Sequence, residues 1–165
     1  MRIDAHILTG ACVKQIRCLK PSFLMENIDT IVLHATEGCN AMSSAQYLAR
    51  KDTPVSAHLV IARSGAVIQI LPFHVRACHA GQSEHEGRKN FNNFSIGIEL
   101  DNAGRLHRRA TDFFRVLTGS IPLTRYLRQQ NRATRLITTA IRKPKRNARQ
   151  RSARYSKNII CSDIW

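Results

Sequence analysis

The sequence predicts a compact α/β unit in its first 104 residues, followed by a basic segment of different composition. Short runs of β-branched and aliphatic residues are typical of buried strands, and one stretch between them has the apolar spacing of a helix. The distribution of charge along the chain sets a boundary near Gly104. With 165 residues, 43% of them hydrophobic, the chain is long enough for one domain with a modest core.

The first predicted strand covers residues 31–34 and ends on a histidine. Its branched apolar residues pack well on a pleated surface, and no helical spacing competes with that interpretation. His34 then precedes a small polar loop that closes on Gly38. A histidine at a strand end is held rigidly and faces the cleft beyond it, as a catalytic or metal-binding group requires. The alternative is a structural histidine whose polar atoms are satisfied in the core.

The next two elements are a helix and a hairpin. Residues 43–50 predict a short helix capped by serine, because apolar side chains recur there at helical spacing. Residues 55–72 predict an antiparallel hairpin, since two β-rich runs flank Arg63, Ser64 and Gly65. Glycine supplies the positive φ that such a turn needs.

The last predicted strand covers residues 94–100, where aliphatic residues alternate on one face and Gly97 and Glu99 lie on the other. A carboxylate on a central strand is costly to bury without a partner, such as a metal-bound water. The alternative is a glutamate on a solvated sheet face. If the two strands are neighbours, His34 and Glu99 meet. Hydrolysis by a zinc enzyme uses such a pair, because the histidine binds the metal and the carboxylate takes a proton from the metal-bound water.

Charge and cysteine usage limit the classes of function. Residues 1–104 carry 10 Lys and Arg against 9 Asp and Glu, whereas residues 105–165 carry 16 against 2. The five cysteines include no C-x-x-C pair, so we expect reduced thiols and, by default, a cytoplasmic setting. No apolar run is long enough to span a bilayer, and we expect no Sec signal. Action outside the cytoplasm would then use export without a cleaved signal, or phage lysis.

Three stretches together resemble a known family: VLHATEG, VSAHLVIARSGAVIQILPFHVRACHAG and NNFSIGIELDNAG. Over residues 28–104 their order and spacing are similar to those of the zinc-dependent N-acetylmuramoyl-L-alanine amidases, the type 2 amidases related to peptidoglycan-recognition proteins. The resemblance implies a mixed central β-sheet flanked by helices. It also implies a monomer that binds peptidoglycan or muropeptide and hydrolyses the amide bond between N-acetylmuramic acid and L-alanine of the stem peptide.

The resemblance assigns roles residue by residue. His34 corresponds to the first zinc ligand, and Glu99 to the catalytic carboxylate that activates a metal-bound water. His58 lies in a stretch that the family places on the strand beside the metal, and it is expected to be structural or to support a ligand.

The rim of the substrate groove is expected further along the chain. His79, Gly81 and Arg88 resemble that rim, where small residues admit substrate and a cation meets a stem-peptide carboxylate. The family usually has tryptophan just before the first of these residues, and this chain has Cys78 instead.

The C-terminal metal motif of the family, G-H-x-D-I-A-P-G-R-K-x-D-P-G, has no recognisable counterpart. After His107 the chain contains no histidine, so the second zinc ligand cannot come from its usual place. The stretch from Cys161 through Asp163 to Ile164 is the nearest match to H-x-D-I. Thiolate is a competent zinc ligand, which makes Cys161 and Asp163 the candidates for the remaining ligands.

Three interpretations of residues 105–165 stay open: a shifted reading frame or degenerate gene, a basic arm that contacts anionic polymers without sequence specificity, and a disordered solvated run. Two functions of different class also stay open. The first is a zinc amidase, of which this chain is a full or damaged member. The second is a non-catalytic peptidoglycan-binding module that lacks a complete metal site.

Overall fold

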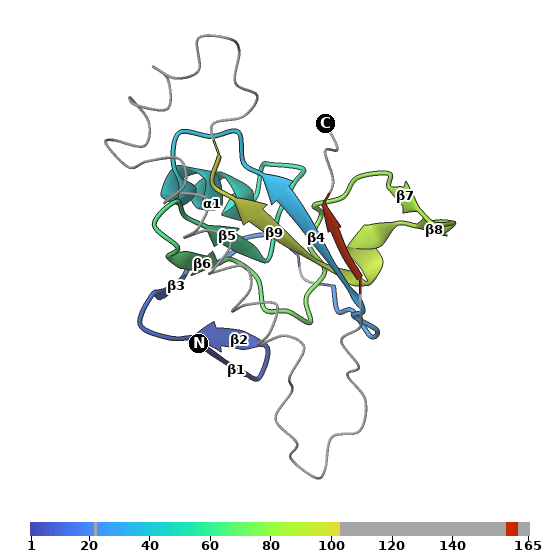
Figure 1. The fold of residues 1–165 in the computed structure, drawn as a ribbon, viewed down its shortest axis with the longest axis horizontal. Helices are drawn as coiled ribbons and strands as arrows, with labels where there is room; N and C mark the ends of the chain where they lie inside the picture. Colours follow the sequence, from blue (N-terminus) through green and yellow to red (C-terminus); the bar gives the residue numbers. More distant parts are fainter. Residues whose placement is uncertain (22, 103–157, 162–165) are drawn as a thin grey trace.

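The computed structural model describes residues 1–21 and 23–102, together with the backbone of residues 158–161 (Figure 1). In chain order, the elements are β1 (Arg2–Asp4), β2 (Ile7–Thr9), β3 (Val13–Gln15), β4 (Thr30–Ala35), α1 (Ala41–Ala49), β5 (Leu59–Ile61), β6 (Val67–Gln69), β7 (Glu84–His85), β8 (Arg88–Lys89), a 3₁₀ turn (Phe91–Asn93), β9 (Ser95–Leu100) and β10 (Asn158–Cys161).

The central sheet is mixed, as the sequence predicts, and its strand order is β10-β4-β9-β5-β6-β3. Strands β10, β4, β9 and β5 run parallel, β6 is antiparallel to β5, and β3 is parallel to β6. Figure 1 shows β4 and β9 side by side across the middle of the molecule. The carboxyl ends of β4 and β9 therefore lie side by side at one end of the sheet, and a long connection follows each strand. In α/β proteins the functional site commonly lies at this end of the strands.

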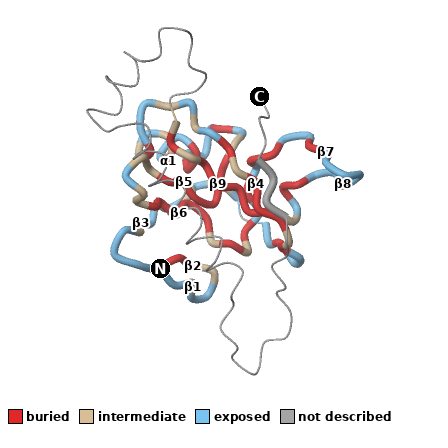
Figure 2. Tube along the Cα trace, viewed as in Figure 1, coloured by how far each residue is buried: buried red, intermediate tan, exposed pale blue. Residues whose placement is uncertain are grey.

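The sheet buries apolar side chains on both faces. On one face, the aliphatic rows of β4 and β9 pack with Leu8, Met25 and Phe73 from the segments that cover them. On the other, α1 packs through Ala45 and Leu48 against β5 and β6. Figure 2 shows the resulting band of buried backbone along the central strands, with exposed residues at β7, β8 and the N-terminal strands.

The predicted strands and hairpin are confirmed, and the predicted helix cap is wrong. Strands β4 and β9 cover the two predicted runs, and β5 and β6 form the antiparallel pair with Gly65 at φ +85° in its turn. Helix α1 is capped by Asn40, whose side chain accepts a hydrogen bond of 2.9 Å from the Ser43 amide. Asparagine is as good a cap as serine, and it lies three residues before the predicted start.

Short strands that the sequence did not predict complete the fold. The hairpin β1–β2 turns at Ala5 and His6, both at positive φ, and β7–β8 forms a second small hairpin. In the described part of the chain, no helix is long and apolar enough to cross a membrane. The boundary predicted near Gly104 lies outside the described residues.

Candidate active site at the ends of β4 and β9

His34 and Glu99 lie directly opposite each other on neighbouring parallel strands. The register pairs His34 of β4 with Glu99 of β9 and, on the other side, Val60 of β5 with Glu99. Paired residues of adjacent strands share a face, so the imidazole and the carboxylate belong to the same side of the sheet. Both side chains are buried, with exposed fractions of 4% for His34 and 8% for Glu99. The solvated-face alternative for Glu99 is therefore wrong.

Burial changes the protonation of both groups. It lowers the pKa of His34 to about 4, so the imidazole is neutral at physiological pH. It raises the pKa of Glu99 to about 7, so this carboxyl group exists in both forms near neutrality. A carboxyl group with a pKa near the working pH is suited to accept a proton in one step and return it in another.

His79 lies inside the fold beside His34, not at the rim where the sequence led us to expect it. Its Nδ1 is 2.9 Å from Nε2 of His34, and the two rings meet nearly edge to face with their centroids 5.1 Å apart. The ring of His79 also lies on the backbone of Gly97, where an added Cβ would come within 2.3 Å of its Cγ. A third buried side chain therefore belongs to the His34 and Glu99 cluster.

The position of His79 is fixed by residues next to β9. The backbone amides of His79 and Ala80 both donate to Oδ1 of Asn92, at 2.9 and 2.8 Å. Nε2 of His79 lies 3.1 Å from the hydroxyl of Ser95. That hydroxyl in turn donates to the carbonyl oxygen of Phe91 at 2.5 Å. Sequence analysis did not identify Asn92 or Ser95, because ordinary polar residues carry no motif of their own.

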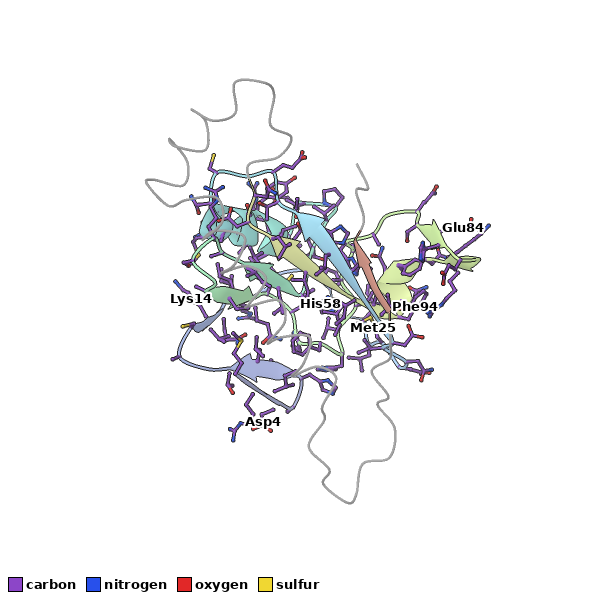
Figure 3. The ribbon with its side chains drawn as sticks, in the orientation of Figure 1. Asp4, Lys14, Met25, His58, Glu84 and Phe94 are labelled. Atoms are coloured by element: carbon purple, nitrogen blue, oxygen red, sulfur yellow. The ribbon has the colours of Figure 1, made fainter. Side chains whose placement is uncertain are left out.

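His58 lies at the centre of the fold, where both of its ring nitrogens bond to the backbone (Figure 3). Its Nε2 donates to the carbonyl oxygen of Val75 at 2.8 Å, and the Gly97 amide donates to its Nδ1 at 3.0 Å. Burial lowers the pKa of His58 to about 4. This histidine links β9 to the segment that follows β6.

Arg88 and Gly81 occupy different environments. Nη2 of Arg88 donates to both carboxylate oxygens of Asp29, at 2.9 and 3.0 Å, and the guanidinium carbon lies 4.0 Å from the centroid of the Phe94 ring. It is therefore already paired within the protein, which differs from the free rim cation that the sequence suggests. Gly81 adopts φ +51°, with open space where a Cβ would be.

The described residues do not complete a metal site. Among them, no group of three or more His, Cys, Asp or Glu side chains could hold a metal ion. Strand β10 runs beside β4 and pairs Cys161 with Leu33, one residue before His34. Asp163 lies outside the described residues.

Part of the chain is similar in sequence to curated amidases. The chain is 52% identical to the 1,6-anhydro-N-acetylmuramyl-L-alanine amidase AmpD of Escherichia coli over 52 residues, which cover 32% of this chain and 28% of that relative. It is 51% identical to AmpD of Haemophilus influenzae over 47 residues, or 28% of this chain and 26% of that one. The matched segments thus span little more than a quarter of the curated relatives.

Solved structures extend the comparison to most of the chain. A crystal structure of a selenomethionine AmpD derivative superposes with a TM-score of 0.56 and 27% identity, covering 84% of this chain and 80% of that one. The solution structure of the PlyG catalytic domain has a TM-score of 0.50 at 18% identity, over 78% and 69% of the two chains, and shares the fold. Residues 24–158 match the family described as N-acetylmuramoyl-L-alanine amidase, Amidase_2. The chain therefore belongs to the N-acetylmuramoyl-L-alanine amidase family.

Proposed function

We propose that this chain is a peptidoglycan amidase that hydrolyses the amide bond between N-acetylmuramic acid and the L-alanine of the stem peptide. The observation that carries the proposal is the buried pairing of His34 with Glu99 at the shared edge of β4 and β9, in a chain of the amidase family. AmpD relatives are named for 1,6-anhydro-N-acetylmuramyl-L-alanine, so the proposed substrate is an anhydromuropeptide fragment.

Glu99 is the proposed general base. Its carboxylate takes a proton from a water molecule as the water oxygen attacks the amide carbonyl carbon. When the carbon–nitrogen bond breaks, the same carboxyl group returns the proton to the leaving amine of L-alanine. The products are the lactyl carboxylic acid and the free peptide amine. A pKa of about 7 suits Glu99 to both transfers.

Zinc is the proposed cofactor, because the family is generally zinc-dependent, and His34 is the proposed first ligand. The described residues do not by themselves fit a complete zinc site. Cys161 and Asp163 are the proposed further ligands, and the proposal is supported by β10, which ends at Cys161 and pairs with the strand of His34.

Zinc content tests this ligand proposal. We expect the purified full-length chain to retain about one zinc ion per molecule after dialysis against a weak chelator, measured by elemental analysis. The variants His34→Ala, Cys161→Ser and Asp163→Asn should each lower that content, whereas His85→Ala, at an exposed histidine, should not. Full zinc in the first three variants would contradict the ligand assignment.

The Glu99→Gln variant tests the proposed reaction. Glutamine keeps the size of the side chain but cannot accept the proton, so turnover of an anhydromuropeptide should fall about 10²–10⁴-fold. Chromatography measures the release of the stem peptide that begins with L-alanine. Glu84→Gln is the matched control, because Glu84 is exposed on β7 and pairs with Lys89 at the surface. Wild-type turnover in Glu99→Gln would exclude the general-base role.

Two further proposals concern the setting of the enzyme. The basic residues 105–165 are proposed to contact anionic polymers without sequence specificity, which retention of the full chain on heparin, decreasing with salt, would test. The cytoplasm is the proposed compartment, because the cysteines of the described region are all free.

The alternative function is a non-catalytic binding module. The names of the relatives favour an amidase over such a module.

A further inference from the structure

A chain of hydrogen bonds with a defined direction leads from the main chain to His34. It begins at the carbonyl oxygen of Phe91, which can only accept a hydrogen bond. The hydroxyl of Ser95 lies 2.5 Å from that oxygen and therefore donates its single proton to it. The oxygen of Ser95 is then an acceptor for any other partner.

His79 continues the direction of this chain. Its Nε2 is 3.1 Å from the Ser95 hydroxyl oxygen and 3.4 Å from the Ser95 carbonyl oxygen. Both atoms are acceptors, so Nε2 of His79 carries the hydrogen. His79 is only 5% exposed, and none of the hydrogen bonds described for it goes to a carboxylate. At about pH 8 such an imidazole is neutral, so its Nδ1 carries a lone pair.

The last link determines the state of His34. Nε2 of His34 lies 2.9 Å from Nδ1 of His79, and an acceptor at this distance requires a hydrogen on the His34 nitrogen. We infer that Ser95 and His79 position the proton of His34 on Nε2, so that Nδ1 is the nitrogen with the lone pair. His79 is thus a positioning residue, and Nδ1 of His34 is the atom that can act as an acceptor or ligand in the site.

Two features hold this arrangement in place. The amide oxygen of Asn92 fixes the backbone at His79 through two hydrogen bonds, and Gly97 leaves room for the His79 ring. His34, His79 and Ser95 are all buried, with exposed fractions of 4%, 5% and 0%, so water does not compete for these bonds. Buried hydrogen bonds in a chain also polarise one another in the same direction.

This inference deepens the proposed function, because it names the nitrogen of His34 that serves the site. Its test does not depend on catalysis. We would label the histidines of the full-length chain with ¹⁵N and record long-range ¹H–¹⁵N correlations at about pH 8, where imidazoles are neutral. We expect the His34 pattern of a ring protonated at Nε2. A pattern of protonation at Nδ1 would overturn the inference, whatever the amidase activity.

Variants of His79 identify what sets the tautomer. In His79→Asn, the amide oxygen can take the place of Nδ1 as acceptor, so His34 should keep its Nε2–H pattern. In His79→Leu, the acceptor is lost, and His34 should show a mixture of both tautomers. The exposed His85→Asn is the control and should leave the His34 signals unchanged. If His79→Leu does not fold, the wild type and His79→Asn still decide: loss of the Nε2–H pattern in His79→Asn would refute the positioning role.

Discussion

At the residue scale, Gly97 matters through the side chain it lacks. An added Cβ would lie 2.3 Å from Cγ of His79 and 2.7 Å from its Cδ2 and Nδ1, closer than real Cβ atoms approach other heavy atoms. The neighbouring strand positions are filled by aliphatic side chains that face the opposite core. A glycine inside a strand often marks such a close approach, so its position in the sequence was an available signal.

Gly97→Ala should displace the ring of His79 and weaken its bond to His34. The overpacking should lower the free energy of unfolding by roughly 1–3 kcal/mol, measured by urea denaturation. The His34 ¹⁵N signals should also lose their single-tautomer pattern.

Ile96→Val is the matched control for that variant. It removes one methylene from the same strand on the opposite face, where Ile96 is fully buried. The loss should be about 0.5–1.5 kcal/mol, with unchanged His34 signals. If Gly97→Ala left both stability and signals as in the wild type, the contact between Gly97 and His79 would have no energetic role.

The residues that sequence reasoning could and could not place differ in a physical way. His34 follows from its place at the end of a buried apolar run, and Glu99 from the alternation of residues 94–100, which fixes its face. His79 lies in a segment without regular structure between β6 and β7, so no periodicity predicts where it points. Its burial depends on Asn92, Ser95 and Gly97, which are brought to it only by the tertiary fold.

At the element scale, Gln69 of β6 joins the N-terminal hairpin to the sheet. Its Oε1 accepts from the amide of Leu8 at 2.7 Å, and its Nε2 donates to the carbonyl oxygens of His6 and Leu71 at 3.1 and 3.0 Å. The side chain is only 1% exposed. A buried amide thus replaces the ladder of backbone bonds that a longer strand pair would have supplied.

Gln69→Leu should release β1–β2 from the rest of the fold. The Leu8 amide would lose its partner, and the His6 carbonyl oxygen would keep the Phe73 amide but lose the Gln69 donor, which should lower stability by about 1–3 kcal/mol. Hydrogen exchange measured by NMR should become faster at Leu8 first. Gln15→Leu is the milder control, because Gln15 is exposed and donates to the carbonyl oxygen of Leu8. An exchange rate at Leu8 in Gln69→Leu equal to that of the wild type would show that Gln69 does not hold the hairpin.

The elements found only in the structure are the shortest ones. Strands β1, β2 and β3 have three residues each, and β7 and β8 have two, too few for alternation to be read. Strands β5 and β6 are equally short, but they lie in longer β-rich runs on either side of a glycine-containing turn, which the sequence does reveal. The turn of β1–β2 contains Ala5 and His6 at positive φ, where a hairpin signal would need glycine or asparagine. Tertiary contacts therefore determine these elements, whereas β4, β5, β6 and β9 follow from local sequence.

At the scale of the whole molecule, buried histidines make stability depend on pH. Between about 4 and 6.5, the unfolded chain binds protons at His58 and His34 that the folded chain does not. His79 is shifted in the same direction. Their contribution to the free energy of unfolding is therefore present above the usual histidine pKa and is lost as pH falls towards 4. Glu99 has a raised pKa and opposes this, because its contribution declines as pH rises through about 7.

Since His58 and His34 together outweigh Glu99, the chain should be roughly 1–2 kcal/mol less stable at about pH 5 than at about pH 7, measured by urea denaturation. Glu99→Gln removes the opposing contribution, so its loss over the same interval should be larger. Equal stability of the wild type at the two pH values would contradict the burial of neutral imidazoles.

The direction of the hydrogen bonds around His34 has an origin that substitution cannot remove. Side chains along the chain of bonds can be exchanged, but its first acceptor is the main-chain oxygen of Phe91, at the start of the 3₁₀ turn Phe91–Asn93. Any descendant sequence that keeps this turn also keeps the main-chain acceptor at residue 91, which determines which atom donates at each hydrogen bond of the chain. Sequence drift at Ser95 or His79 is then constrained by a feature of the backbone, and compensating pairs at these two positions are the expected trace of that constraint.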